Sequence, residues 1–420
     1  MKEMSPGRTA LGVGLVAAIA ALFMLFVGFG TQSLVDTSGD PYQYASLARR
    51  MLTDGFAAHG LTKREASLYP ALIAAVYAIT DEAPRVVKLL QCVMFAATSM
   101  IVFAIARRLY NVRTAVIAGL LYALNPLPLR YVADLHMETM VTLALMLCVW
   151  TMVRFADRPT VGRGLIVGAA AGVAALTKAI AIVPPLTFGA YLVGRRLVSY
   201  LRGTSPPAPT GPLAAIVVAT LAVIIPWTVR NYQVTGGHFV LIAPGLSDAF
   251  LRGFVFSRSE YALLRRPPYA DAENECNAWF AEICRRAGTE FGRDEVLDEK
   301  ILGAVARQKI ADEPMEVVRK TIVGLFTFWY QMTTRLNSVV TGAIAGAAWL
   351  FALIGWRRAR QEGRSSWLLW LPILSMNVAI ALLCSLGRYS MPIIPCLMIL
   401  AAFGIDTLLR TRQPDRAAAV

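Results

Sequence analysis

Residues 86–108 read VVKLLQCVMFAATSMIVFAIARR, an apolar run that ends in two arginines. A helix needs about 20 such residues to cross the hydrocarbon core of a bilayer, which is about 30 Å thick. Similar runs occupy residues 11–30, 339–356 and 366–386. A helix satisfies all its backbone hydrogen bonds within one segment, as a spanning element must. The sequence therefore predicts an all-α protein that crosses a membrane several times.

The composition agrees with this prediction. Of the 420 residues, 56% are hydrophobic and only 16% are charged, whereas soluble proteins carry about 25% charged residues. The first run follows Lys2 and Arg8 but lacks the small-residue cleavage site of a signal peptide, so we interpret it as a retained span. About ten spans are expected, at residues 10–30, 86–106, 114–129, 139–154, 164–177, 179–194, 213–229, 339–356, 366–386 and 391–409.

The net charge of +14 is distributed unevenly along the chain. With the amino terminus in the cytoplasm, ten spans place the arginine-rich connections, such as Arg107-Arg108 and Arg357-Arg358, on the inner side. The inner segments then carry the whole positive excess, as the positive-inside rule requires. Topology thus explains the basic charge, and we expect no nucleic-acid partner. We expect a multi-pass protein of the inner (plasma) membrane with both termini in the cytoplasm.

The outer material is concentrated in residues 31–85, in a short loop near residue 134, and in a long stretch from 231 to 338. This pattern divides the chain into three parts. They are an amino-terminal transmembrane module (1–230), an outer-face helical segment (231–338) and a carboxy-terminal transmembrane module (339–420). Interfacial helices are expected in the first and last large outer loops.

An amphipathic helix is expected after Asp40-Pro41 and is ended by Gly55. Its apolar residues follow the i, i+3, i+4, i+7, i+8 spacing of a one-sided stripe. They are Tyr44, Leu47, Ala48, Met51 and Leu52. Asp40 suits two roles, as the N-cap before a proline at the first helical position or as an acid that faces a site. Asp36 in the same loop and Glu138 in the second outer loop are further candidate acids.

The cysteines and histidines form no metal-binding pattern. The three histidines, which lack any ligand spacing, are His59, His136 and His238. Cys276, Phe280 and Cys284 fit one helical stripe, on which the two cysteine Cα atoms would lie about 12 Å apart. A disulfide requires less than about 7 Å, so we expect both thiols to be free. No cofactor is expected, and a divalent metal is left open.

Cationic residues stand at the outer ends of the predicted spans, where they are energetically costly. Lys178 lies between two apolar runs, Arg230 ends the seventh span, and Arg388 joins the last two. Lys63 and Arg64 lie in the first outer loop. Each could be an anchor at the headgroup level. Several of them on one face instead favour a site for an anionic, membrane-embedded group such as phosphate.

Several motifs resemble those of GT-C glycosyltransferases, notably the protein O-mannosyltransferases and the aminoarabinose transferases of lipid A. In residues 40–52, DPYQYASLARRML, the acid is followed four residues later by Tyr and eight later by Ala and then Arg. Further matches follow in the expected order up to about residue 405. They are Leu68-Tyr69-Pro70, Leu176-Thr177-Lys178, Pro226-Trp227 with Arg230-Asn231, and Arg388-Tyr389 with Pro392 and Pro395.

The resemblance implies that a sugar moves from a polyprenyl-phosphate donor to a hydroxyl of an envelope acceptor on the outer, periplasmic face, with inversion at the anomeric carbon. It implies that Asp40 is the base, with Asp36 and Glu138 as the next candidates. The cations would hold the departing phosphate; they are Lys178, Arg388, Arg230, Arg64 and Lys63. The tyrosines of the substrate pocket would be Tyr44, Tyr69 and Tyr389.

Two other functions would share part of this pattern. A ligase or polymerase of lipid-linked glycans would also have basic outer loops, but it would be expected to lack the motif of residues 40–52. A transporter of an anionic lipid or solute usually places its polar residues and broken helices near the bilayer midplane. In this chain the polar residues lie at the outer ends of the spans, which favours the transferase.

Overall fold

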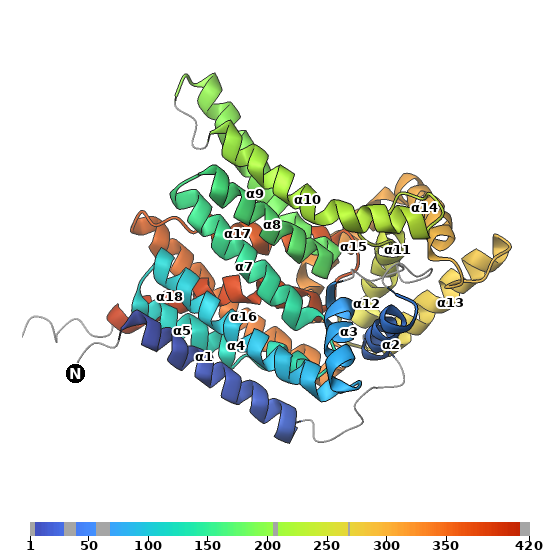
Figure 1. Cartoon of the computed structure of the whole chain (residues 1–420), viewed down its shortest axis with the longest axis horizontal. Helices are drawn as coiled ribbons and strands as arrows, with labels where there is room; N and C mark the ends of the chain where they lie inside the picture. The colour runs from blue at the N-terminus through green and yellow to red at the C-terminus, as the bar shows by residue number, and fades with distance from the viewer. Residues whose placement is uncertain (1–4, 29–38, 56–67, 205–208, 268, 412–420) are drawn as a thin grey trace, which may run out of the picture.

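The computed structural model describes residues 5–28, 39–55, 68–204, 209–267 and 269–411. These residues form helices and connecting loops, with no strand among them. Most helices run along one direction as a bundle (Figure 1). The all-α class predicted from the apolar runs is therefore confirmed.

A helix covers each of the ten predicted spans. Six are long and apolar enough to cross a membrane: Pro6–Val27 (α1 with η1), Pro84–Leu109 (α4), Glu138–Asp157 (α7), Thr210–Val234 (α10), Arg335–Gln361 (α16) and Gly387–Arg410 (η3 with α18). A seventh is the pair Val112–Ala123 (α5) and Pro126–Val132 (α6), which bends by 54°. Shorter helices fill the other positions: Val161–Thr177 (α8), Ala179–Ile182 (η2) with Val183–Leu201 (α9), and Trp367–Ala381 (α17). Ten spans stay a prediction.

Glycines let two pairs of helices approach closely within the bundle. On α8, a Cβ atom at Gly168 would lie 2.2 Å from the carbonyl oxygen of Ile216 on α10. On α18, a Cβ at Gly404 would lie 2.0 Å from the carbonyl oxygen of Phe351 on α16. Both contacts are too short for any side chain. Small residues at helix contacts are the usual packing device in membranes, where lipid tails offer little hydrophobic drive.

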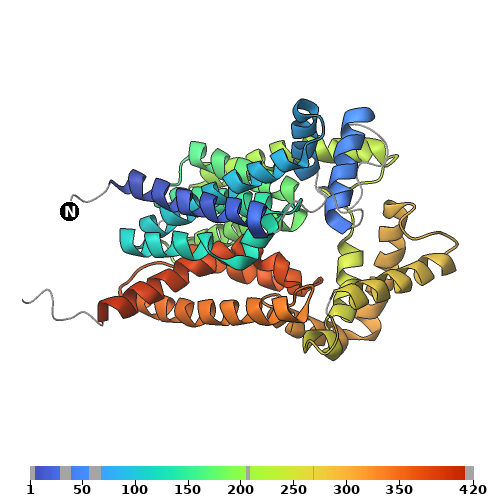
Figure 2. The ribbon, with the colours of Figure 1, turned by 90° about the horizontal axis from the view of Figure 1, so that it is seen from below.

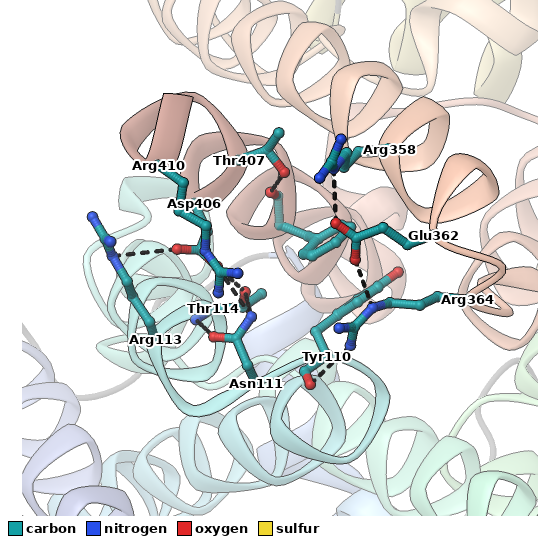
Figure 3. Close-up of polar contacts among 11 residues, drawn as sticks. Tyr110, Asn111, Arg113, Thr114, Arg358, Glu362, Arg364, Asp406, Thr407 and Arg410 are labelled. Carbon is teal, nitrogen blue, oxygen red and sulfur yellow. Dashed lines mark hydrogen bonds and ion pairs between the residues drawn. The ribbon is translucent and has the colours of Figure 1, made fainter. Parts of the chain in front are cut away.

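At one end of the bundle, an acidic residue connects α18 with the start of α5 (Figure 3). Asp406 of α18 is fully buried and accepts hydrogen bonds from Asn111 Nδ2 (3.0 Å) and Thr114 Oγ1 (2.9 Å) at the start of α5. Arg410 (2.9 Å) and Arg113 (3.2 Å) complete its surroundings. We call these five residues the Asp406 cluster. Helix α1 begins and α18 ends at this end of the bundle (Figure 2).

The opposite end carries the helices of the large loops (Figures 1 and 2). They are α2 (Gly39–Thr53), α3 (Leu68–Thr80), α11 (Leu246–Phe256), α12 (Ser259–Ala262), α13 (Ala270–Arg286), α14 (Glu295–Asp312) and α15 (Pro314–Thr327). On α13, Cys276, Phe280 and Cys284 form one buried stripe and both thiols are free, as predicted.

Candidate active site

Helix α2 is held by its apolar stripe, as its spacing predicted. Tyr44, Ala48 and Met51 are buried, and the ring of Tyr44 meets that of Tyr69 on α3 edge-on, with centroids 5.1 Å apart. Leu52, the last member of the predicted stripe, is instead exposed. The helix begins at Gly39, so Asp40 lies inside its first turn rather than before it.

Asp40 forms an ion pair with Arg388, which is 348 residues away in the sequence. The distance from Arg388 NH1 to Asp40 Oδ2 is 2.7 Å, and the side chains are 15% and 26% exposed respectively. Burial raises the pKa of Asp40, but the nearby charges of Arg388, His136 and Lys178 lower it by more. The net result is a pKa below the usual value of 3.8. Asp40 is therefore an ionised carboxylate at neutral pH.

Arg388 is positioned by the short helix η3 (Gly387–Ile393). The backbone N–H of Gly387 donates to the carbonyl of Gln331 at 2.6 Å. A Cβ at this glycine would lie 2.8 Å from Met332 Sδ and 3.1 Å from that carbonyl oxygen, so a larger residue would require these neighbours to shift. The Cζ atom of Arg388 lies 5.2 Å from the ring centroid of Tyr389 and 5.7 Å from that of Tyr269.

A second pair, Glu138 and Lys178, lies near the first. Glu138 opens α7 and is almost fully buried, and its Oε1 is 3.5 Å from Lys178 Nζ. Its Oε2 is buried and has no hydrogen-bond partner among the described residues. Lys178 Nζ also lies 4.4 Å from the ring centroid of Tyr389, so Lys178 and Arg388 both lie close to one tyrosine ring.

Both pairs border a cavity of about 390 Å³. Of the predicted site residues, those that line it are Asp40, Tyr44, Glu138, Lys178, Arg388 and Tyr389. Tyr69 does not line it, because its ring is enclosed and its hydroxyl donates to Gln91 Oε1 at 2.6 Å. Arg230 does not line it either, and its guanidinium stacks 4.6 Å from the ring of Trp227. Asp36, Lys63 and Arg64 lie outside the described residues.

Another wall of the cavity comes from α11 and α13, where the sequence analysis singled out no residue. Asp248 and Arg252 of α11 line it together with Tyr269 and Glu273 at the start of α13. Charges of both signs alternate from Asp271 to Glu316, so nothing in the sequence distinguishes Glu273 from its charged neighbours. Within the described part of the chain, no group of three or more His, Cys, Asp or Glu side chains is arranged to hold a metal ion.

A family model described as dolichyl-phosphate-mannose-protein mannosyltransferase matches residues 65–228. This segment includes Glu138 and Lys178. No curated protein sequence matches the chain.

Two solved structures resemble this chain at low sequence identity, and the first of them shows its fold. The archaeal oligosaccharyltransferase AglB from Archaeoglobus fulgidus, in complex with an inhibitory peptide and a dolichol-phosphate, superposes with a TM-score of 0.59 at 15% identity, over 97% of this chain and 51% of that chain. The chain thus spans about half the length of AglB. ArnT from Cupriavidus metallidurans bound to undecaprenyl phosphate is 16% identical, with a TM-score of 0.41, over 98% of this chain and 80% of that chain. The resemblance that the motifs indicated is confirmed, and this chain has the fold of the GT-C glycosyltransferases.

Proposed function

We propose that this protein is a membrane glycosyltransferase that moves a sugar from a polyprenyl-phosphate donor to an acceptor hydroxyl, with Asp40 as the base. The observation that carries the proposal is the Asp40–Arg388 ion pair on the cavity, in which a carboxylate lies beside a guanidinium, a group suited to binding phosphate. The match of residues 65–228 to the mannosyltransferase model supports the class of reaction.

The two cations suit a phosphate that gains charge during the reaction. The donor phosphodiester carries one negative charge, and the polyprenyl phosphate that leaves it carries up to two. Arg388 and Lys178 both lie near the Tyr389 ring, so one phosphate group can contact both. Preorganised charges that meet a developing charge in a dry site are usually the largest single contribution to catalysis.

Asp40 takes the acceptor's proton. As the acceptor oxygen bonds to the anomeric carbon, the bond from that carbon to the phosphate oxygen breaks, and the configuration inverts. The acceptor proton ends on Asp40 and the electron pair on polyprenyl phosphate. Arg388 lowers the pKa of Asp40, which makes the carboxylate a weak base in the empty site. A phosphate that competes for Arg388 weakens that pairing and makes Asp40 a better proton acceptor.

The position of the cavity favours transfer over transport. The cavity lies among helix ends and outer helices at the end of the bundle away from the Asp406 cluster, whereas transporters bind their substrates near the midplane. The arginine-rich connections lie at the Asp406 end, which supports a cytoplasmic location for that end and an outer location for the cavity. The residues that line the cavity come from all three proposed parts of the chain, 1–230, 231–338 and 339–420.

The test is transfer by the purified full-length chain in lipid nanodiscs. Polyprenyl phosphates that carry radiolabelled mannose, glucose or arabinose would be supplied with an extract of membrane acceptors. We expect release of free polyprenyl phosphate and label on an acceptor with at least one donor. Lys178→Ala should weaken binding of bare polyprenyl phosphate, whereas Lys309→Ala on the outer helix α14 should not. Failure of the wild-type protein to bind any polyprenyl phosphate would contradict the proposal.

The orientation has a separate test. Because all six native cysteines are buried, an impermeant thiol reagent should report on introduced cysteines. Ser259→Cys on α12 and Ser365→Cys before α17 replace exposed serines. We expect only the first to react from the outside of intact cells. Equal labelling of both would contradict the proposed topology.

A further inference from the structure

The cavity wall formed by α11 and the start of α13, which we call the outer wall, has a different charge pattern from the wall that holds Asp40. On the Asp40 side, two carboxylates face two cations, in the pairs Asp40–Arg388 and Glu138–Lys178. On the outer wall, one arginine serves two carboxylates. Arg252 Nε contacts Asp248 Oδ1, and Arg252 NH1 lies 2.7 Å from Glu273 Oε1. The outer wall therefore keeps one excess negative charge and repels a phosphate, while carboxylate oxygens attract hydroxyl donors.

Arg252 fixes this wall in place. Besides the two carboxylates, its NH2 donates to Asn277 Oδ1 at 3.0 Å, and its Cζ lies 5.2 Å from the centre of the Phe280 ring. Its side chain is only 11% exposed. Each guanidinium nitrogen of Arg252 thus has a contact, although NH1 makes an ion pair without a hydrogen bond. Its role is to hold Glu273, whose side chain is 31% exposed and lines the cavity.

Tyr269 connects the two walls. It precedes α13, and the backbone N–H of Glu273 donates to its carbonyl at 2.8 Å, so the two side chains lie one turn apart. Its ring lies 5.7 Å from Arg388 Cζ on the other wall. Burial raises the pKa of Tyr269, which also experiences the charges of Arg388, Asp40, Glu273 and Arg252. A group attached to a phosphate at Arg388 therefore has Tyr269 beside it and Glu273 beyond.

We propose that Glu273 and Tyr269 form the subsite for the donor's sugar, in which Glu273 accepts hydrogen bonds from sugar hydroxyls and the Tyr269 ring packs against the apolar face of the sugar. This inference rests on the proposed function and adds the recognition of the transferred group. The phosphate is directed to one wall by Lys178 and Arg388, and the excess negative charge of the other wall keeps it there. The sugar ring lies between the walls, with its hydroxyls toward Glu273.

The test compares the affinity of the full-length chain for polyprenyl phosphate with its affinity for the same carrier bearing mannose, glucose or arabinose. We expect the wild-type protein to prefer at least one sugar-bearing carrier. Glu273→Gln should reduce that preference about 10- to 100-fold, since a hydrogen bond to a charged group contributes that much. Binding of the bare carrier should not weaken. Tyr269→Leu should also reduce the preference, without any change of charge.

Glu275→Gln is the matched control. Glu275 lies two residues further along α13, so it points to another side of the helix, and it is also paired with an arginine, Arg258 NH1 at 2.6 Å. It does not line the cavity, and its loss should leave the sugar preference unchanged. Thermal unfolding of each variant checks that the fold is intact.

Three outcomes would overturn the subsite. They are an unchanged sugar preference in Glu273→Gln, a wild-type protein that binds bare and sugar-bearing carriers equally, and a variant that loses transfer but keeps the donor preference. The last outcome would assign Glu273 to the acceptor. Each of them leaves the proposed function standing, because binding of polyprenyl phosphate by the wild-type protein tests that function separately.

Discussion

Acidic and basic residues meet at both ends of the helix bundle, but their surroundings differ. At one end, Asp406 is fully buried and its carboxylate is surrounded by Asn111, Thr114, Arg113 and Arg410 (Figure 3). At the other end, Asp40 has one close ion-pair partner, and Glu138 is paired with Lys178 at 3.5 Å. Each end has one buried carboxylate oxygen without a hydrogen bond among the described residues, on Asp406 and on Glu138. A cavity adjoins the second set of acids, and none of the residues that line it belongs to the first.

The difference separates a structural from a chemical use of charge. Asp406 contacts two hydrogen-bond donors and two arginines and does not line this cavity, so its carboxylate holds α5 and α18 together. Asp40 has one close ion-pair partner and lines the cavity, so a ligand can replace that partner. Acids whose pKa is perturbed and that border a cavity are expected at functional sites. This rule predicts opposite consequences for mutations at the two ends.

The largest effect is expected for Asp40→Asn. Asparagine keeps the shape of the side chain but cannot take a proton, and loss of a general base typically costs about 10²–10⁴-fold in rate. The transfer rate of the purified variant measures this, with thermal stability recorded on the same sample. Asp54→Asn is the control, since Asp54 lies exposed just after the same helix. An active, stable Asp40→Asn protein would assign the base to another acid.

The end that holds Asp406 should respond in stability instead. Asp406→Ala leaves Asn111 and Thr114 without their acceptor, and a buried donor left unpaired costs about 1–3 kcal/mol. Denaturation in mild detergent should show a lower midpoint, while the rate per folded molecule stays near that of the wild type. Asp157→Ala is the comparison at the same end, because its pair with Arg108 is exposed and such pairs contribute little. A large loss of rate in folded Asp406→Ala would break the distinction between the ends.

The pH dependence of transfer tests the Asp40–Arg388 pair. Because the pKa of Asp40 lies below 3.8, the base stays ionised as pH falls to about 4, and the acid limb of kcat/KM lies below that value. The matching contribution to stability is present above pH 3.8 and is lost as pH falls through the lower, folded pKa. Arg388→Gln removes the strongest lowering charge and leaves burial, so the acid limb should move upward. An unmoved limb would exclude Asp40 as the group that titrates.

Lys320 is a buried cation near the cavity, and it allows the same distinction between structural and chemical charges to be tested there. Its Nζ donates to the carbonyls of Leu382 (2.7 Å) and Leu383 (3.3 Å), and it lies 4.2 Å from the ring of Phe250. Burial lowers the pKa of Lys320 to about 8. Between that value and 10.5 the unfolded chain binds more protons, so stability should rise with pH across this window. In Lys320→Met that rise should disappear, with transfer changed only slightly. A variant with the wild-type pH slope would contradict the assignment.

Local patterns were enough to predict many elements. Runs of apolar residues such as 86–106 predict helices whose backbone is satisfied internally, and this depends on nothing beyond the segment. The stripe from Tyr44 to Met51 predicted which side of α2 is buried. The stripe of Cys276, Phe280 and Cys284 likewise predicted free thiols, because eight helical residues fix that distance wherever the helix lies.

The site itself was decided by tertiary structure. Asp40 and Arg388 are separated by 348 residues, and no local pattern specifies which cation meets which acid. Tyr69 and Arg230 belong to sequence motifs that match as well as those of Tyr44 and Lys178. Helix packing nevertheless leaves Tyr69 and Arg230 off the cavity, whereas Tyr44 and Lys178 line it. Glu273 lies among alternating charges that look alike in sequence, and tertiary structure distinguishes it from Glu275 by its contact with Arg252 and its place on the cavity. Periodicity along a helix determines which face is apolar, whereas the pairing of distant charges depends on how the helices pack.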